Sequence, residues 1–462
     1  MHPRTTVGGR TEAAATAFTS SRDWQQVRES WTGDADPREG ASSVTTTRPR
    51  DAGGVSGGPR TVEPRWGWPA PWPLAPPPPP RSGDPRLAAP RGTPAGLGLG
   101  GLSRLYRESA QSPWRDALVR EDLEDGSLAR HVAAGVRGLC ASPAVFARRL
   151  GSSARYREQL SWLTSTGCSA AQVYREVAAA DVQAACAVLG PTFEGSPEPD
   201  GLVSLDVAPP FVASTRTAVA AAHRLHHRID RPNFIVGIRA TAQGVPAIQA
   251  LVTAGRSVNA TSICSLRRYR TVLEAYVAGM EAFVARGGNP ANVYGVATFA
   301  VALVDTSVDS RLAVSTDSRA AGLLGAAGVA QATLAHRLFT DCFSTSRWRR
   351  LADLGARPQR LAFSTAGTDV TSPQVRRYVR ELVLPNTVHA LSKAGIAALD
   401  GNPAPVSTLP AKTQRADAVL ADLAHLGIDL DVIGLALEDK AAAQVQGSFA
   451  RALARIGSSE PR

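Results

Sequence analysis

The sequence predicts an α/β protein of the (β/α)8 TIM barrel class, preceded by a disordered N-terminal extension. From residue 111 onward, short β-rich runs alternate with helical stretches rich in Ala, Leu and Arg, a pattern typical of a parallel sheet with crossover helices. Eight such units fit into about 350 residues, a length that suits a barrel with insertions. No glycine-rich phosphate-binding turn follows any run, which disfavours the alternative, an open doubly wound sheet.

The strands are expected at the apolar, β-branched runs. In chain order these runs are 113–118, 136–140, 202–207, 234–238, 258–263, a stretch within 293–304, 360–364 and 387–391. Helices are expected between them near 126–134, 154–166, 170–189, 215–229, 245–254 and 266–285.

Residues 1–110 differ in composition from the rest of the chain. They hold 16 of the 33 prolines and five of the eight tryptophans, without helical or strand periodicity. The sequence therefore predicts a disordered extension before a barrel of residues 111–462. Trp66, Trp68 and Trp72 stand between prolines and suit a docking segment for a partner protein. The alternative is an extension without function.

Charge, hydropathy and cysteine usage narrow the functional class. The net charge is +11, but the basic residues are thinly spread, so solvated faces are favoured over a nucleic-acid surface. The mean hydropathy is −0.10 and the longest uncharged stretch is broken by Gly, Asn and Pro, which argues against a membrane helix. The five cysteines form no CxxC pair and residues 1–20 hold no apolar run, so we expect free thiols, a cytoplasmic location and no metal or cofactor.

Polar residues stand at or just after most of the expected strands. In a barrel of this class the functional site is built at the carboxyl ends of the strands. The residues selected by that rule are Asp116, Ser142, Asp206, Asn259, Thr261, Thr298 and Ser364. Their convergence from different strands favours a pocket for a polyhydroxylated ligand. The alternative is a polar network inside the barrel core.

Nine segments between residue 111 and about residue 428 resemble motifs of the transaldolase family, in particular its longer bacterial subclass. They are 114–116, 135–138, 142–146, 203–207, 230–233, 244–248, 258–261, 304–309 and 364–368. The resemblance implies a (β/α)8 barrel and the transfer of a dihydroxyacetone unit between sugar phosphates of the pentose phosphate pathway. It also implies a Schiff base on a lysine of the fourth strand, whose protonated imine accepts the electrons of C–C cleavage.

Gly237 occupies the position of that lysine. Family members read three apolar residues, Lys, an apolar residue, Pro, a small residue and Thr, whereas residues 234–241 here read Phe-Ile-Val-Gly-Ile-Arg-Ala-Thr. Glycine offers no amine, and Arg239 stays protonated and is a poor nucleophile. The chain has three lysines, all beyond the last expected strand: Lys393, Lys412 and Lys440.

Four further positions depart from the family pattern. Ser142 stands where the family has Asn, and Asp206 where it has Glu. Leu303 replaces a phosphate-binding Arg, and Asp369 lies where a Lys is usual. Loss of two cations deprives a bound phosphate of its strongest hydrogen bonds.

The resemblance implies that Asp116 assists proton transfer, that Asn259 and Thr261 position ligand and water, and that Thr298 replaces a serine. The sequence thus predicts a transaldolase-like protein in which the transfer is lost or severely reduced. The expected vestigial catalytic residues are Asp116, Asp206 and Thr261, and the expected substrate-binding residues are Ser142, Asn259, Thr298 and Ser364. The alternatives are an enzyme with a lysine-independent activity on sugars or sugar phosphates, and a non-catalytic binding or scaffold protein.

Overall fold

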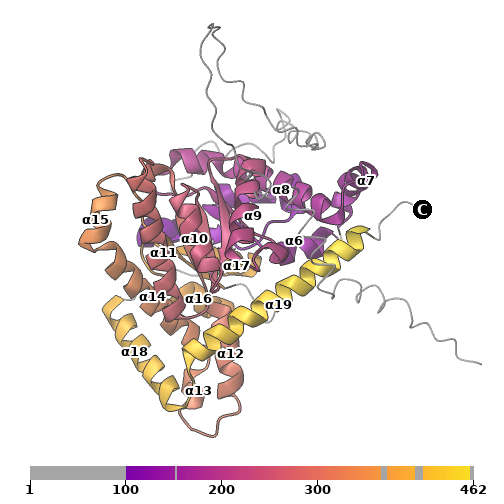
Figure 1. Ribbon diagram of the computed structural model, residues 1–462. Coiled ribbons are helices and arrows are strands. Elements are labelled where there is room, and N and C mark those ends of the chain that lie inside the picture. Colours follow the sequence, from indigo (N-terminus) through magenta and orange to yellow (C-terminus); the bar gives the residue numbers. More distant parts are fainter. Residues whose placement is uncertain (1–99, 151–152, 366–371, 401–408, 458–462) are drawn as a thin grey trace, which may run out of the picture.

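The predicted barrel is present in the computed structural model, which describes residues 100–150, 153–365, 372–400 and 409–457 (Figure 1). Eight strands follow one another in chain order around a closed barrel, and each pairs in parallel with the next. The ring closes where Ser112 pairs with Val388 and Arg115 with Leu391. A closed ring excludes the open doubly wound sheet.

The strand bounds lie close to the predicted ones. The strands are β1 (Ser112–Arg115), β2 (Gly138–Ala141), β3 (Leu202–Asp206), β4 (Phe234–Arg239), β5 (Val258–Ile263), β6 (Gly295–Ala300), β7 (Arg360–Ser364) and β8 (Val388–Leu391). The sixth strand lies within the predicted stretch 293–304, and the apolar run beyond Ala300 becomes helical at Val301 without a loop. The largest difference is in the first run, 113–118, whose strand ends at Arg115.

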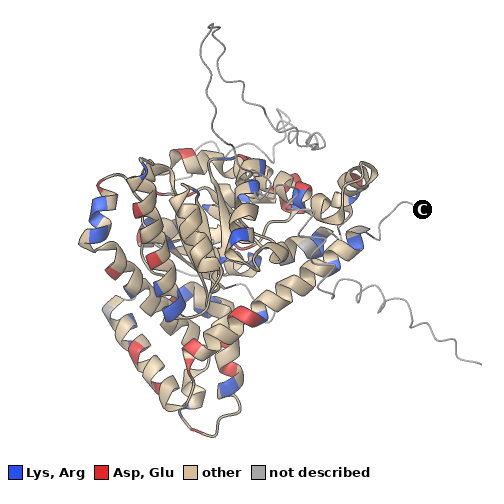
Figure 2. Ribbon diagram, viewed as in Figure 1, with Lys and Arg blue, Asp and Glu red and all other residues tan. Residues whose placement is uncertain are grey.

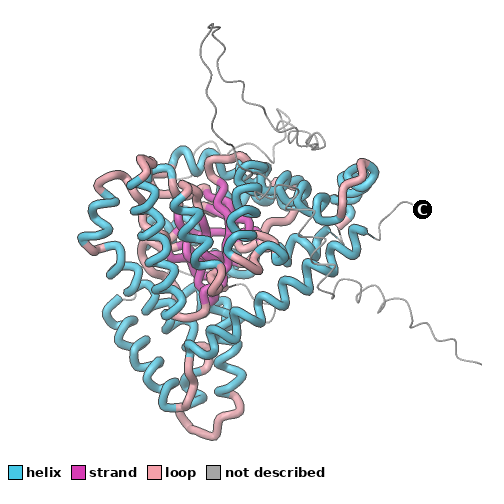
Figure 3. Tube along the Cα trace, in the orientation of Figure 1, coloured by secondary structure: helices cyan, strands magenta, loops and turns pink. Residues whose placement is uncertain are grey.

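Helices surround the strands (Figure 3). They are α3 (Gly101–Ser109), α4 (Arg120–Glu124), α5 (Ser127–Ala133), α6 (Pro143–Leu150), α7 (Arg157–Ser165), α8 (Ala170–Gly195), α9 (Thr215–Ile229), α10 (Gly244–Thr253), α11 (Leu266–Ala285), α12 (Val301–Leu312), α13 (Ala320–Leu323), α14 (Ala327–Phe343), α15 (Ser346–Ala352), α16 (Ser372–Glu381), α17 (Lys393–Asp400), α18 (Leu409–His425) and α19 (Leu430–Gly457). Short 3-10 turns are η1 (Ala154–Tyr156), η2 (Pro209–Phe211) and η3 (Pro290–Asn292). Helices α9 and α11 have their predicted bounds because Ser214 and Ser265 cap them, each accepting a backbone N–H at 3.2 Å.

Helix α3 corrects the predicted boundary of the extension. It lies within the segment 1–110 that composition assigned to disorder, yet it buries Leu102 and Leu105 in one cluster with Leu391 of β8. Two leucines three residues apart share one helix face, which is enough to dock a short helix. The folded unit therefore includes α3, which the prediction had placed in the extension. The remainder of the predicted extension lies outside the described residues, and so do Trp66, Trp68 and Trp72.

Charged side chains of both signs are interspersed over the described surface (Figure 2). In the basic run at 347–350, Arg347 pairs with Glu274 and Glu281, each at 2.7 Å. Such pairs are typical of a solvated face. Within the described ranges, no helix is both long enough and apolar enough to cross a bilayer.

A buried ion-pair network closes the amino-terminal end of the barrel. Asp200, just before β3, accepts hydrogen bonds from Arg137 at 2.5 Å and from Arg360 at 2.8 Å. Arg360 also donates to Ser112 Oγ at 2.8 Å and to the Thr387 carbonyl at 3.1 Å. These groups come from the starts of different strands, so the network fixes that end of the barrel.

Apolar side chains fill the barrel above this network. One cluster takes residues from six strands: Trp114, Leu202, Ile235, Val296, Ala362 and Val388. The indole ring of Trp114 lies against β2 so closely that a Cβ at Gly138 would overlap it. The interior is therefore a packed core, and a ligand has room only beyond the carboxyl ends of the strands.

Helix α19 lies across the carboxyl end of the barrel (yellow in Figure 1). It contacts α6, α8, α12, η2 and β5. Phe449 packs edge to face on Tyr174 of α8, with ring centroids 4.7 Å apart. Gly434 is pressed against the start of α11, because a Cβ there would come within 2.8 Å of Ser265 Cβ. Helix α19 therefore covers the end of the barrel at which the site was predicted.

Candidate functional site

Three neighbouring strands bring several predicted site residues together. Asp206 ends β3, Gly237 lies in β4, and Asn259 and Thr261 lie in β5. The strand register pairs Gly237 with Asp206 on one side and with Asn259 on the other. The predicted Schiff-base position is therefore flanked by two polar side chains.

The carboxylate of Asp206 fills the space that a side chain at Gly237 would need. A Cβ built on Gly237 would overlap Oδ1 of Asp206 and lie 2.8 Å from its Cα. Real Cβ atoms do not approach other heavy atoms so closely, so a larger residue requires this part of β3 to move. The absence of a side chain at residue 237 and the position of Asp206 are thus one structural feature.

Asp206 has a carboxyl group suited to proton transfer near neutral pH. Burial raises the pKa of Asp206 to about 6, although the positive charge of Arg239 and a hydrogen bond from Thr261 both lower it. That hydrogen bond runs from Thr261 Oγ1 to Asp206 Oδ2 at 3.2 Å. A carboxyl group with this pKa changes its protonation state at ordinary working pH.

Asn259 is held in a hydrogen-bonded chain inside the barrel. Its Nδ2 donates to Ser204 Oγ at 3.1 Å, and its Oδ1 accepts from Thr298 Oγ1 at 2.8 Å. The first bond joins β5 to β3 past the bare backbone of Gly237. The amide nitrogen and oxygen of Asn259 and the hydroxyl of Thr298 therefore all have protein partners. This arrangement matches the alternative of a polar network inside the barrel core.

Asp116 lies just beyond β1, and within the described part of the chain no hydrogen bond joins it to Asp206. Burial raises its pKa, and the neighbouring Arg115 partly offsets that effect. Both carboxylates lie close enough to Cys140 to raise the pKa of its thiol, in addition to the larger effect of burial. Asp116 and Asp206 therefore face the same thiol from two sides of β2. Within the described ranges, no group of three or more His, Cys, Asp or Glu side chains is arranged to hold a metal ion.

Ser142 and Ser364 flank this cluster on the outer strands. Ser142 follows β2, and its carbonyl oxygen accepts the N–H of Phe146 at 3.1 Å as α6 begins. Ser364 ends β7, where it pairs with Ala300 and Ala390 of the adjacent strands. Both serines thus lie at the predicted end of the barrel: Ser142 follows β2, which is adjacent to the strand of Asp206, whereas Ser364 lies on β7, on the opposite side of the ring.

The three lysines lie on helices that follow β8. Lys393 Nζ donates to Asp122 Oδ1 at 2.9 Å, and Lys412 Nζ donates to the carbonyl oxygens of Glu381 and Val383, each at 3.0 Å. Lys440 is exposed on α19. None of the three amines lies at Gly237.

Leu303 and Asp369 stand where the resemblance expects phosphate-binding cations. Leu303 lies in α12, partly buried against the main apolar cluster, so its side chain contributes to packing. Asp369 lies outside the described residues.

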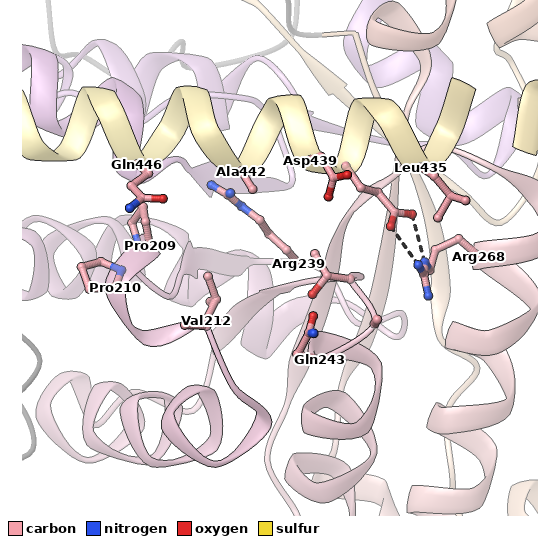
Figure 4. A pocket seen from close by; sticks show the side chains of 14 residues that line it. Pro209, Pro210, Val212, Arg239, Gln243, Arg268, Leu435, Asp439, Ala442 and Gln446 are labelled. Carbon is pink, nitrogen blue, oxygen red and sulfur yellow. Dashed lines mark hydrogen bonds and ion pairs between the residues drawn. The ribbon is translucent and has the colours of Figure 1, made fainter. Parts of the chain in front are cut away.

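A cavity of about 630 Å³ lies between the ends of β3 and β4 and helix α19 (Figure 4). It is lined by η2, by the residues after β4, by Arg268 at the start of α11, and by α19. Arg239, the last residue of β4, points into it. From the sequence alone, Arg239 is predicted only to be a poor nucleophile, although the strand-end rule would select it with the other polar residues. The contribution of α19 could not be predicted, since nothing in its sequence shows which surface it covers.

Barrels of this class carry their ligand sites at the carboxyl ends of the strands, and the polar cluster and the cavity both lie there. Within the class, the family model for transaldolase and fructose-6-phosphate aldolase matches residues 113–456. The chain therefore belongs to the transaldolase/fructose-6-phosphate aldolase family. The match continues past residue 428, where the motif resemblance ended, and through most of α19.

Individual relatives agree with the family match. The chain is 36% identical over 345 residues to a transaldolase of Parafrankia sp. (strain EAN1pec), covering 74% of this chain and 94% of the relative. It is 36% identical to transaldolase 1 of Streptomyces avermitilis, covering 78% and 95%. It is 35% identical to a transaldolase of Thiobacillus denitrificans, covering 75% and 97%. These relatives are matched over nearly their whole length, so the barrel is shared rather than one fragment of it.

Proposed function

We propose that this protein is a transaldolase-like barrel of sugar-phosphate type in which dihydroxyacetone transfer through a Schiff base is lost or severely reduced. One observation carries the proposal: the Asp206 carboxylate fills the space beside Gly237 where the resemblance expects a lysine. A carboxylate cannot condense with a ketose carbonyl, so the imine that serves as electron sink has no nitrogen donor.

The surrounding contacts support this reading. Lys393 and Lys412 are bonded to other groups, and Leu303 offers no charge to a phosphate. Asp116, Asp206 and Thr261 then remain as vestiges of the catalytic set, and Ser142, Asn259, Thr298 and Ser364 as vestiges of the sugar site. The five cysteines are free thiols, which supports a cytoplasmic location.

Borohydride trapping with fructose 6-phosphate, followed by intact-mass measurement, tests the proposal. We expect no covalent adduct and no turnover in a coupled transfer assay, under conditions in which the Thiobacillus denitrificans transaldolase serves as the comparison enzyme. A stoichiometric adduct on one of the three lysines, together with turnover, would overturn the proposal. Peptide mapping would then identify the lysine that carries the chemistry.

A lysine-independent activity on sugars or sugar phosphates is the second candidate. It is favoured by one observation, the two carboxyl groups of raised pKa, Asp116 and Asp206, on either side of β2. Such groups suit enolisation or isomerisation by general acid and base. Proton exchange at the carbon next to the carbonyl of fructose 6-phosphate in D2O tests it, with the Asp206→Asn variant as control. The third candidate, a non-catalytic binding or scaffold role, depends on residues 1–99, and partner capture lost on their deletion would support it.

A further inference from the structure

Arg239 places a buried guanidinium group against the cavity. Only 5% of its surface is exposed, and its Nη1 is buried without a hydrogen-bond partner among the described residues. It forms no ion pair with any residue in those ranges; Asp206 influences it only through its charge, and burial lowers the pKa of Arg239. Arginine nevertheless stays protonated in proteins, so a cation is held here out of water.

Other buried arginines of this barrel are paired. Arg115 bonds Asp122 at 2.6 Å, Arg120 bonds Asp181 at 2.6 Å, and Arg360 bonds Asp200 at 2.8 Å. Burying a charge without a partner is unfavourable, and proteins satisfy it with an opposite charge. Among the described residues, the opposite charge of Asp206 acts on Arg239 only through space and no acid bonds it directly, so a directly bonded anion must come from outside them.

The acidic residues of the cavity do not fill that role. Glu438 of α19 is engaged by Arg268 through two bonds, of 2.9 and 2.8 Å. In Figure 4 the Arg239 side chain extends toward Ala442, away from Arg268 and Asp439. The side chain therefore lines the cavity without a carboxylate bonded to it, although its Nη1 is itself buried.

The rest of the lining suits a small molecule. Gln243 and Gln446 bring amide groups from opposite walls, and Pro209 and Pro210 form an apolar wall. A volume of about 630 Å³ lies within the range of small-ligand sites, which combine an apolar lining with a few polar anchors.

We propose that this cavity binds a small metabolite through an oxyanion, a carboxylate or a phosphate monoester, with the Arg239 guanidinium as the principal donor. Planar guanidinium groups form paired hydrogen bonds with either anion. Leu303, where the resemblance expects a phosphate-binding cation, does not line this cavity. The proposal goes beyond the proposed function, because it requires neither a lysine nor any catalytic step.

Ligand binding is tested on the full chain by thermal unfolding and calorimetry, with inorganic phosphate and malonate as probes and sodium chloride at equal ionic strength as reference. We expect a concentration-dependent rise in melting temperature with at least one probe. A response to phosphate assigns a phosphate monoester, and a response to malonate assigns a carboxylate. The absence of a response to both probes would overturn the proposal.

Variants of Arg239 locate the binding. Arg239→Met should weaken binding of the responding probe on the order of 100-fold, and should raise the melting temperature without probe, since it removes an unpaired buried charge. Arg239→Lys should keep the charge but bind more weakly than wild type, because it loses the paired geometry. Arg311→Met, which makes the same charge change on the exposed face of α12, should bind like wild type.

Two results would contradict the assignment to Arg239. One is undiminished binding by Arg239→Met, and the other is a lower melting temperature of that variant without probe, which would mean that the guanidinium is paired within the protein. Neither depends on imine trapping, so failure here is distinguishable from failure of the proposed function.

Discussion

The two ends of the barrel hold equally buried arginines in opposite ways. At the amino end, Arg360 is 6% exposed and bonds Asp200, Ser112 and Thr387. At the carboxyl end, Arg239 is 5% exposed and its Nη1 has no partner in the described part of the chain. The two arginines carry the same charge and are buried to nearly the same extent, so they differ in whether an acidic side chain bonds them. The amino end uses its cation for stability, whereas the carboxyl end leaves a cation available to a ligand.

The aspartates of the two ends differ in the same way. Asp200 is fully buried and receives two arginines. Asp206 receives one hydroxyl, and its pKa is raised to about 6. Charge-assisted hydrogen bonds from arginine are stronger than a hydrogen bond from a neutral hydroxyl. The polar groups at the carboxyl end are therefore stabilised less than those at the amino end, which is the usual condition of a functional site.

The largest expected effect is at the amino end. Asp200→Ala should lower the free energy of unfolding by about 3–5 kcal/mol, because it strands the buried charges of Arg137 and Arg360. Urea unfolding measures this effect. Asp317→Ala, which removes an exposed pair with Arg319, should leave the free energy of unfolding nearly unchanged. If Asp200→Ala lowered the free energy of unfolding as little as Asp317→Ala does, the ion-pair network of Asp200 would not be what stabilises the amino end of the barrel.

The pH dependence of stability should isolate Asp206. Its pKa is about 6 in the folded protein against 3.8 as the ordinary value, so the folded state binds the proton more tightly. Stability from this group is therefore present at low pH and is lost as the pH rises from about 4 to about 6, by roughly 2–3 kcal/mol.

The Asp206→Asn variant should lack that component. Asp181 and Asp305 also have pKa values raised to about 6, but they titrate in both proteins and cancel in the difference. Urea unfolding at pH 4.5 and at pH 7 gives the comparison, and we expect the variant to gain on wild type at the higher pH. Parallel pH profiles of the two proteins would show that Asp206 is already paired.

A smaller effect is expected at Gly237. Gly237→Ala should cost about 1–3 kcal/mol, because the new Cβ overlaps the Asp206 carboxylate. In an Asp206→Ala background the cost should fall, but not to zero, since the Cα of residue 206 remains close. Gly322→Ala is the matched control: Gly322 lies in α13 with nothing near its Cβ, so that change should be neutral or stabilising. Additive losses in the double variant would exclude the contact.

Much of the barrel was predictable from local pattern. Runs such as 258–263 and 360–364 are β-branched or apolar and bounded by loops, and they form strands at those bounds. Helix α3 was not predicted, because its docking depends on Leu102 and Leu105 meeting a surface formed by residues far along the chain. The candidate site divides in the same way. The positions of the strand ends predict which residues lie close together. They do not predict that the side chain of Asn259 is already hydrogen-bonded to Ser204 and to Thr298.

The side chain that strand-end reasoning passed over is Arg239. Its position was visible in the sequence, but its meaning depends on burial and on the absence of a partner within the described residues, which are three-dimensional facts. Helix α19 creates that burial, and its sequence alone does not say that it crosses β4. A site made by two distant segments is therefore the part that pattern alone does not predict.

The smallest expected effect is the recovery of activity by Gly237→Lys. The variant places an amine where the resemblance expects one, and Asp116, Asn259 and Thr261 remain nearby, so borohydride trapping with fructose 6-phosphate should give a minor adduct. Its amine would lie against Asp206, whose negative charge raises the pKa of a lysine and so reduces the fraction that is a free nucleophile. Gly237→Arg is the control, with similar bulk and no nucleophilic amine.

Turnover should hardly rise, because Leu303 and Asp369 still deny the substrate phosphate its cations. Adding Leu303→Arg and Asp369→Lys should strengthen binding of phosphorylated sugars, since charge-assisted hydrogen bonds contribute about 1.5–3 kcal/mol each. Adding Asp206→Glu, the residue expected from the resemblance, should increase the adduct further by moving the carboxylate away from the backbone of residue 237. If the combined variant gives no adduct, the carboxyl end has been remodelled beyond these positions. If Gly237→Lys alone restores full transfer, the phosphate is bound by other groups, and Arg239 is the first to test.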